Sequence, residues 1–337
     1  MKAMVMESLG SANLRLKEVP DPKPGPGEVL VRLRAASLNF RDLLALEGGY
    51  GSRQKSAHLI PLSDGAGEVV EVGAGVKAWQ AGDRVVGCFF PDWLSGPPNE
   101  AMMARDLGGM EDGVACELRV FGAEGLVAMP KSLSFVEAAA FPCAGVTAWN
   151  AVRADAGIGP GQVVLTQGCG GVALFALQIA SAAGARVIAL SSSEEKMARL
   201  RQLGAQDTLN YKEDPDWGKT ARKLTGQRGV DLVVETGGAQ TLKQSIRATR
   251  MGGTIAMIGM VSGPTAELNL PLVAMSSLRI HGVAVGHRDH LAQSLAAFET
   301  NGIKPVIDST YPLEALAEAV AHVKSGKQFG KVCIEIA

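Results

Sequence analysis

The 337-residue sequence has little excess charge, few cysteines and no cysteine pair of the kind that binds structural zinc. Its 33 basic and 34 acidic residues leave a formal net charge of -1, so no basic surface for nucleic acid or an anionic membrane is expected. The five cysteines are odd in number, widely spaced and never arranged as C-x-x-C, which argues against a disulfide framework. We therefore expect small-molecule partners, further copies of the same chain and a reducing, cytoplasmic location.

The sequence also lacks an evident export signal or membrane span. The N-terminal stretch MKAMVMESLGSANL has no long apolar run of the signal-peptide type. Residues 171–190, GVALFALQIASAAGARVIAL, are apolar, but Gln178 and Arg186 interrupt them, so they are interpreted as a buried helix followed by a buried strand. With 47% hydrophobic residues, a chain of this length predicts two globular domains.

The hydrophobic pattern changes near residue 130. The segments before it are short, rich in β-branched residues and divided by glycine and proline, which predicts a β-rich domain. Residues 131–287 alternate helices with strands that are apolar on both faces, such as VDLVVE, as in a doubly wound parallel sheet. The α/β fold predicted is therefore a β-rich domain over residues 1–130 and 288–337, with a Rossmann domain between them.

A glycine-rich turn follows the predicted strand QVVLTQ. Gly168, Gly170, Gly171 and Val172 stand in the sequence GCGGVA, which fits the pattern G-x-G-x-x-A, and a helix begins there. The first glycine permits a tight turn, and the second lets backbone N–H groups approach a pyrophosphate at the helix N-terminus. The turn predicts a dinucleotide site. Its alternative is close packing between helix and strand alone.

The end of the next strand, in LSSSEEK, bears on which dinucleotide is bound. An acidic residue there would bind the ribose 2′-hydroxyl of NAD, but Ser191 and Ser192 occupy the place and Lys196 follows a turn later. This favours NADP(H) over NAD(H). Glu194 and Glu195 also lie nearby, in the first turn of a helix that Ser193 is expected to cap.

The order of these parts resembles the medium-chain dehydrogenase/reductase superfamily, with a GroES-like β domain, a Rossmann domain and a returning tail. Zinc alcohol dehydrogenases of that superfamily bind catalytic zinc through a cysteine, a histidine and a second cysteine. Here Asn39 stands at the first position, in SLNFRD, Ser63 stands at the second, in PLSDGAG, and only Cys143 matches. One thiolate does not supply the three protein ligands of a catalytic zinc, so the resemblance implies a protein without zinc.

Several segments are similar to the zinc-independent quinone oxidoreductase branch of that superfamily. The stretch NFRDLLALEGGY has Asn39, Asp42, Gly48 and Tyr50 at the branch's spacing, and PLSDGAG nearly reproduces P-G-S-D-x-A-G with a leucine in place of the first glycine. The resemblance implies further cofactor contacts at Thr147, Tyr211, Ile258, Gly259, Met260, Phe329, Gly330 and Lys331.

The candidate catalytic residues are Asn39 and Tyr50. Asn39 is expected to donate to a substrate carbonyl oxygen or to orient the nicotinamide ribose, and Tyr50 is expected to donate a proton or to plug the pocket. The substrate pocket is expected to include Phe40, Ser63, Trp93 and Cys143. No activating histidine beside Cys143 is identifiable from the sequence, so packing at the pocket wall is favoured over a nucleophilic role.

These residues favour hydride transfer to a quinone or an α,β-unsaturated carbonyl. Such substrates spread developing negative charge through their own π system, so hydrogen-bond donors can replace a Lewis-acidic metal. Two alternatives stay open. One is a zinc-independent, NADP-dependent alcohol dehydrogenase in which Asn39 or Ser63 relays the proton, and the other is an NADPH-binding protein without catalysis.

Two further segments are distinctive. Residues 91–112 form an insertion relative to compact quinone reductases, and a lid and an oligomer contact are both open roles for it. In HGVAVGHRDH, His281 and His287 lie six positions apart in a strand-like segment, so they share a face but are too distant to meet at one metal ion. Because this segment resembles the last Rossmann strand and an apolar edge strand needs covering, we expect a homodimer through it.

Overall fold

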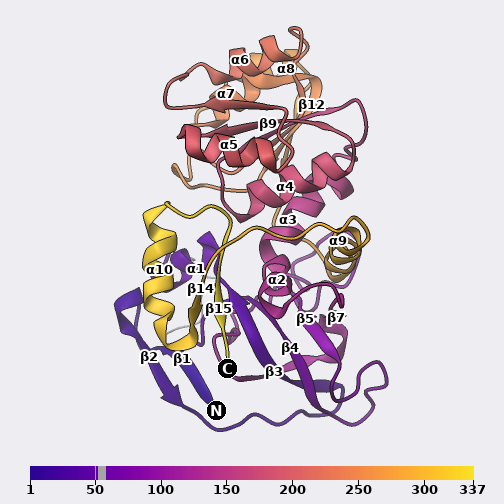
Figure 1. Cartoon of the computed structure of the whole chain (residues 1–337), viewed down its shortest axis with the longest axis vertical. Helices are drawn as coiled ribbons and strands as arrows, with labels where there is room; N and C mark the ends of the chain where they lie inside the picture. Colours follow the sequence, from indigo (N-terminus) through magenta and orange to yellow (C-terminus); the bar gives the residue numbers. More distant parts are fainter. Residues whose placement is uncertain (50, 52–57) are drawn as a thin grey trace. The chain divides into compact units, whose positions relative to one another are not determined.

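The computed structural model describes residues 1–49, 51 and 58–337, which divide into two compact units (Figure 1). The first unit comprises Met1–Val146 and Val285–Ala337, and the second comprises Thr147–Ala284. The sequence boundaries at residues 130 and 288 thus differ from these divisions by 16 and 3 residues, since 146 − 130 = 16 and 288 − 285 = 3.

Residues 131–146 lie with the first unit because their contacts are made there. The Ser37 hydroxyl donates to Ala139 O at 2.8 Å, and the Cys143 N–H donates to Asp64 Oδ2 at 3.0 Å. The rings of Phe141 and Phe298 meet edge to face with centroids 4.9 Å apart. Fully buried aromatic contacts of this kind belong to a core, which is why this segment does not separate with the second unit.

The first unit is built on β-strands, as predicted. Strands β1 and β2 pair antiparallel, and β14, β15, β3, β4, β5 and β7 form a sheet in that order, with β6 pairing to β3. The bounds are β1 Lys2–Met6, β2 Leu14–Glu18, β3 Glu28–Ser37, β4 Asp64–Val72, β5 Arg84–Gly87, β6 Leu118–Gly122, β7 Leu126–Ala128, β14 Ile307–Pro312 and β15 Lys331–Glu335.

Helices at the strand ends complete this unit. They are α1 Phe40–Leu46, α2 Phe135–Ala139, α9 Arg288–Thr300 and α10 Leu316–Ser325, with 3₁₀ turns at Ser11–Asn13, Ala123–Gly125 and Leu313–Ala315. A continuous helical segment follows α2, comprising the π turn Phe141–Gly145, α3 Val146–Trp149 and the π turn Asn150–Asp155. The π turns place Cys143 and its neighbours in an irregular stretch of helix, a feature frequent at functional sites.

The C-terminal strand of the chain joins the larger sheet of the first unit. Strand β15, in yellow in Figure 1, lies beside β3 and runs antiparallel to it, with Cys333 opposite Ser37. The N–H of Leu38 continues this pairing by donating to Val332 O at 2.9 Å. The same register, continued one step further, brings residue 331 opposite residue 39.

The second unit is a parallel sheet covered by helices, and the predicted Rossmann architecture is confirmed. Its strands lie in the order β10-β9-β8-β11-β12-β13, which is the doubly wound order 3-2-1-4-5-6. The strands are β8 Val163–Gln167, β9 Arg186–Ser191, β10 Asp207–Asn210, β11 Val230–Glu235, β12 Thr249–Met257 and β13 Arg279–Gly282. The helices are α4 Gly171–Ala182, α5 Glu194–Gln202, α6 Trp217–Leu224, α7 Leu242–Ala248 and α8 Leu270–Met275.

The burial of the central strands explains their apolar sequences. Every residue of β8 and of β11 is buried, because helices cover both faces of the sheet. The helix α4, which the sequence offered as an apparent membrane span, is a 12-residue element beside this sheet. Among the described residues no helix combines the length and the apolarity that crossing a bilayer requires.

Candidate active site

In the first unit, the N-terminus of α1 carries a buried polar cluster. Asn39 precedes the first turn, and its N–H donates to Asp42 Oδ2 at 2.7 Å. Arg41 Nη1 lies 3.1 Å from Asp42 Oδ1. Burial raises the pKa of Asp42, and Arg41 opposes that rise because its guanidinium stabilises the charged carboxylate.

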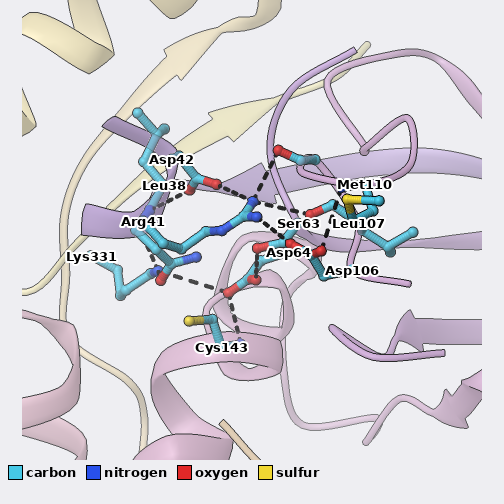
Figure 2. Close-up of polar contacts among 12 residues, drawn as sticks. Leu38, Arg41, Asp42, Ser63, Asp64, Asp106, Leu107, Met110, Cys143 and Lys331 are labelled. Atoms are coloured by element: carbon cyan, nitrogen blue, oxygen red, sulfur yellow. Dashed lines mark hydrogen bonds and ion pairs between the residues drawn. The ribbon is translucent and has the colours of Figure 1, made fainter. Parts of the chain in front are cut away.

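A second buried carboxylate, Asp64, begins β4 and links three elements of the first unit (Figure 2). It accepts hydrogen bonds from Ser63 Oγ at 2.6 Å and from the Cys143 N–H at 3.0 Å, and Lys331 Nζ lies 3.9 Å from it. Burial raises the pKa of Asp64, while Lys331 and the Ser63 hydroxyl oppose the rise. Ser63 and Cys143, predicted for one site, therefore do lie at the same carboxylate.

Asn39 and Lys331 meet in the same cluster. Lys331 Nζ donates to Leu38 O at 2.6 Å and to Asn39 Oδ1 at 2.5 Å. The Nδ2 atom of Asn39 is buried and has no hydrogen-bond partner within 3.5 Å among the described residues, although the amide is near enough to help lower the pKa of Asp64. A buried donor without a firm partner is rare in a folded protein, so the Nδ2 atom of Asn39 is the candidate hydrogen-bond donor of this cluster.

The thiol of Cys143 is not an activated nucleophile in this structure. Burial raises its pKa, and the neighbouring carboxylate of Asp64 raises it further. A neutral thiol can pack against its neighbours but is a poor nucleophile. This agrees with the packing role that the sequence analysis favoured for Cys143.

The leucine that stands at the place of the first glycine in PLSDGAG adopts a left-handed backbone conformation, which favours glycine. Leu62 has φ of 70° and is fully buried. A non-glycine residue in this left-handed region costs about 1–3 kcal/mol. Its carbonyl accepts from the Val114 N–H at 3.0 Å, and Gly113 packs so closely that an added Cβ would lie 1.8 Å from Leu62 O. Backbone packing thus holds the turn that delivers Ser63 and Asp64.

The glycine turn of the second unit has the geometry that its sequence predicts. Gly168 has φ of 77°, its N–H donates to Leu190 O at 2.9 Å, and Gly170 is the N-cap of α4. A Cβ added at Gly168 or at Gly170 would meet nothing within 4 Å, so the backbone there is open. Val172 stands in the first turn of α4, whose free N–H groups suit a pyrophosphate.

The residues that follow β9 retain a polar, partly cationic surface. Ser191 is buried with its hydroxyl 3.4 Å from Cys169 Sγ, Ser192 is half-buried, and Ser193 caps α5 by accepting from the Lys196 N–H. Glu194 forms an ion pair with Arg201, which offsets one of the two nearby negative charges. Contacts of Ser191, Ser192 and Lys196 with a 2′-phosphate stay a prediction.

A buried carboxylate that sequence reasoning did not identify braces the loop after β11. Glu235 Oε1 accepts from the N–H groups of Gly237 and Gly238 and from Thr241 Oγ1, at 2.8, 2.9 and 2.6 Å. Its Oε2 accepts from Gln167 Nε2 at 2.9 Å and from Ser245 Oγ at 2.5 Å. The detectable signal is an acidic residue that ends the apolar strand VDLVVE immediately before Thr-Gly-Gly.

These contacts lie where a doubly wound sheet binds ligands. Strands β8 and β11 are neighbours at the point where the strand order reverses. The end of β8 is joined to the loop after β11 by Gln167 Oε1, which accepts from the Thr236 and Gly237 N–H groups. The predicted segment Ile258–Gly259–Met260 packs on the same loop, and an added Cβ at Gly259 would lie 2.1 Å from Thr236 O. The structure thus brings the predicted glycine turn and the predicted 258–260 loop to one edge of the sheet.

The remaining predicted site residues fall in several places. Phe40 is 41% exposed, Trp93 is buried against Phe90 and His287, Thr147 is buried at the start of the second unit, and Tyr211 is 42% exposed after β10. Phe329 is buried, and Gly330 has φ of 111° with Val306 O 2.3 Å from the position of an added Cβ. Tyr50 lies outside the described residues.

Comparison with known proteins agrees with this arrangement. Residues 25–131 match the alcohol dehydrogenase GroES-like domain, and residues 171–326 match the zinc-binding dehydrogenase family. A zinc-type alcohol dehydrogenase-like protein of Schizosaccharomyces pombe is 42% identical over 95% of this chain and 93% of its own length. The chain belongs to the medium-chain dehydrogenase/reductase superfamily. It is a nicotinamide-dependent oxidoreductase of the zinc-type alcohol dehydrogenase-like kind.

Other relatives show the range of chemistry in this superfamily. The acryloyl-coenzyme A reductase of Sulfurisphaera tokodaii is 33% identical over 99% of this chain and all of its own. A structure from Sinorhizobium meliloti 1021, described as a candidate alcohol dehydrogenase, has a TM-score of 0.93 at 41% identity and covers 99% of this chain and 98% of its own. The crotonyl-CoA reductase of Streptomyces collinus, a mycobacterial quinone oxidoreductase and an NADPH-bound mycobacterial structure also match.

Several of these family names mention zinc, so we compared the side chains at the candidate positions with the ligands that catalytic zinc prefers. Within the described part of the chain, no group of three or more histidine, cysteine or acidic residues is placed to hold an ion. The candidate positions present an amide at Asn39, a hydroxyl at Ser63 and one thiol at Cys143, with the ammonium of Lys331 beside Asp64. Catalytic zinc favours thiolate, imidazole and carboxylate, so this donor set does not fit it.

Proposed function

We propose that this oxidoreductase reduces a quinone or an α,β-unsaturated carbonyl with NADPH and without zinc. The observation that carries the proposal is the buried Nδ2 of Asn39, a hydrogen-bond donor with no firm protein partner beside Ser63, Asp64 and Cys143. In the proposed reaction this N–H binds the carbonyl oxygen of the substrate. It stabilises the negative charge that develops there because donor and dipole are already in place before reaction.

A conjugated substrate suits an amide donor better than a simple ketone does. A metal ion supplies several kcal/mol of Lewis-acid stabilisation, whereas one neutral donor supplies about 3 kcal/mol. A quinone or an enone reduces the demand on that donor because its own π system spreads the charge. Acryloyl- and crotonyl-coenzyme A, in the names of two relatives, contain a double bond conjugated to a thioester carbonyl.

The second unit fits the cofactor. When bound, a nicotinamide dinucleotide supplies the hydride. The first turn of α4 would hold the pyrophosphate, and Ser191, Ser192 and Lys196 would receive the 2′-phosphate of NADPH. Thr147, Tyr211 and the 258–260 loop remain predicted cofactor contacts, and Glu235 would keep the loop after β11 in place without touching the ligand.

The Ser63–Asp64 pair supports a second candidate function. The Ser63 hydroxyl donates to the buried Asp64 at 2.6 Å, a pair that suits proton transfer from an alcohol, and several relatives carry the name alcohol dehydrogenase. A zinc-independent alcohol dehydrogenase is therefore the second proposal. For the reductase, Tyr50 stays the predicted proton donor. It lies outside the described residues.

The first experiment measures metal content, cofactor preference and turnover on one preparation. Zinc is quantified by mass spectrometry, the thermal midpoint is compared with NADPH, NADH and neither, and NADPH oxidation is followed with a panel of quinones, enones and enoyl thioesters. We expect no stoichiometric zinc, larger stabilisation by NADPH and turnover on conjugated substrates. Turnover only with alcohols would favour the second candidate, and zinc-dependent activity would overturn the proposal.

The variant Asn39→Ala tests the donor itself. We expect kcat to fall about 10²–10³-fold, with the Kd for NADPH unchanged, because an oxyanion-type donor acts mainly in the transition state. The matched control is Asn301→Ala, which removes an exposed amide at the C-terminal end of α9 and should leave kcat unchanged. Wild-type kcat in Asn39→Ala would remove this residue from the mechanism.

A further inference from the structure

Lys331 has an unusual environment for a lysine. Only 3% of its surface is exposed, although lysine is almost never fully buried unless it is paired. Its Nζ has three oxygen neighbours: Leu38 O at 2.6 Å, Asn39 Oδ1 at 2.5 Å and Asp64 Oδ2 at 3.9 Å (Figure 2). Two of its three N–H donors therefore have hydrogen-bond acceptors in Leu38 O and Asn39 Oδ1, and Asp64 is an ion-pair partner at a longer distance.

The local fold explains why Lys331 reaches this position. The N–H of Phe329 is tied to Asp308 Oδ1 at 2.7 Å, and Gly330 turns the chain at φ of 111° against Val306. Strand β15 then begins at Lys331, in the register that places it opposite Asn39. The segment Phe-Gly-Lys, which the sequence assigned to cofactor contacts, therefore directs its lysine into the first unit.

The contact with Lys331 decides which way the Asn39 amide faces. An ammonium only donates, so the amide atom that faces it must be the oxygen, because the flipped amide would set NH₂ against NH₃⁺. With Oδ1 held at 2.5 Å, Nδ2 must point away from Lys331, and it is the buried donor that has no firm partner. A cation at Oδ1 also polarises the amide and strengthens Nδ2 as a donor.

We propose that Lys331 is a positioning residue for the reduction. It locks the Asn39 amide in the orientation that presents Nδ2 to the substrate carbonyl oxygen, and it touches neither substrate nor cofactor. This inference rests on the proposed function of Asn39. The ammonium of Lys331 also compensates the buried negative charge of Asp64. Asp64 in turn accepts hydrogen bonds from the Ser63 hydroxyl and the Cys143 N–H and so keeps both groups in place.

A double-mutant cycle tests this dependence. We compare kcat, KM and the Kd for NADPH in the wild type, Lys331→Met, Asn39→Ala and the double variant. If Lys331 acts through Asn39, Lys331→Met lowers kcat about 10- to 100-fold, and the double variant loses no more than Asn39→Ala alone. Losses that multiply would overturn the proposal, and so would a weakened Kd for NADPH, because that result assigns Lys331 to the cofactor.

Two further variants separate positioning from folding. Lys304→Met, the matched control, removes a surface ammonium that lies 3.1 Å from Glu137 and should leave kcat, KM and Kd unchanged. Lys331→Gln keeps an N–H donor without the charge, so it is used in the same cycle should Lys331→Met not fold. We expect Lys331→Gln to retain more kcat than Lys331→Met, and equal or greater loss would contradict the positioning role.

A spectroscopic measurement separates this inference from the proposed reaction. The ¹⁵N side-chain resonance of Asn39, identified by its loss in Asn39→Ala, should shift in Lys331→Gln without any substrate present. If no substrate of the panel is reduced but this resonance shifts, the proposed function fails while the Lys331–Asn39 coupling stands. If turnover is found and the resonance does not move, the positioning role fails while the reductase stands.

Discussion

Three buried aspartates in the first unit each have a lysine or arginine side chain nearby. Asp42, Asp64 and Asp106 are all fully buried, and each lies within 4 Å of a lysine or arginine nitrogen. Burying a carboxylate without such a partner is strongly unfavourable. The cations are therefore required wherever the fold buries these acids, whatever role each one has in the reaction.

Two half-buried histidines at the start of α9 show the opposite case, in which a titratable group stays neutral. The rings of His287 and His290 stack with centroids 3.5 Å apart, and His287 Nδ1 accepts from the His290 N–H at 3.2 Å. Burial lowers the pKa of His290 to about 4, and the neighbouring His287 lowers it further. The pKa of His287 is also lowered by burial. Both rings are thus expected to be uncharged at neutral pH.

This pair predicts a loss of stability in mild acid. Between pH 6.5 and about 4 the unfolded chain binds a proton at His290 that the folded chain does not, so the free energy of unfolding falls as the pH falls through this window. We expect about 1–2 kcal/mol from His290, less than for a fully buried ring because solvent screens it. Urea unfolding at about pH 7 and about pH 5 measures this change.

The variant His290→Gln should flatten that dependence on pH, because its amide does not titrate. The control is His58→Gln, at an exposed histidine, which should keep the wild-type slope. If His290→Gln loses as much stability between the two pH values as the wild type does, the stacked pair is not the source of the acid sensitivity.

At the scale of elements, the insertion at residues 91–112 is fixed to the first unit by one buried arginine. Arg41 Nη2 lies 2.5 Å from Asp106 Oδ2, and Nη1 donates to Leu107 O and Gly108 O at 3.0 and 3.1 Å (Figure 2). Arg105 pairs with Glu111 and Asp92 in the same insertion, but on its exposed side. The N–H of Arg288 also donates to Trp93 O at 2.9 Å, which ties the insertion to α9.

The two arginines should differ strongly when they are replaced. Arg41→Met leaves the fully buried Asp42 and Asp106 without their cation, and we expect a loss of about 3–5 kcal/mol in the free energy of unfolding. Arg105→Met breaks an exposed pair and should lose less than about 1 kcal/mol. Urea unfolding measures both, and limited proteolysis reports whether residues 91–112 detach first. Equal losses in the two variants would contradict the anchoring role of Arg41.

At the scale of the whole molecule, the sheet of the second unit ends at β13, beside which no further strand lies among the described residues. Strand β13 ends the order of strands and is only partly buried, and α8 carries Leu270 and Met275 at 68% and 79% exposure. Exposed apolar side chains beside a free strand edge are typical of an interface. We therefore propose that two copies of the chain pair through β13, with α8 at the contact.

Light scattering coupled to size exclusion tests this pairing. We expect the mass of a dimer for the wild type and a shift toward the monomer in Met275→Glu, because the contact would bury a carboxylate without a partner. The control is Leu9→Glu in the first unit, also at an exposed apolar residue, which should leave the mass unchanged. A monomeric wild type at micromolar concentration would contradict the proposal.

Features that are encoded by residues close together in the sequence could be predicted without the structure. The apolar strands and the glycine turn identify a Rossmann unit because strand burial and helix N-termini are encoded within about 30 residues. The replacements at Asn39 and Ser63 were likewise visible, since they occur inside short motifs. Glu235 was missed because its importance lies in five donors that come from the end of β8, the loop after β11 and the helix α7.

Contacts between residues far apart in the sequence became visible in the folded chain. The predicted cofactor contact of Lys331 stays a prediction, and it was the register between β15 and β3 that set this lysine against Asn39, 292 positions away in sequence. Arg41 and Asp106, 65 positions apart, meet in the same way across an insertion. Strand register and loop closure depend on the packing of the whole core, and no local pattern of residues records them.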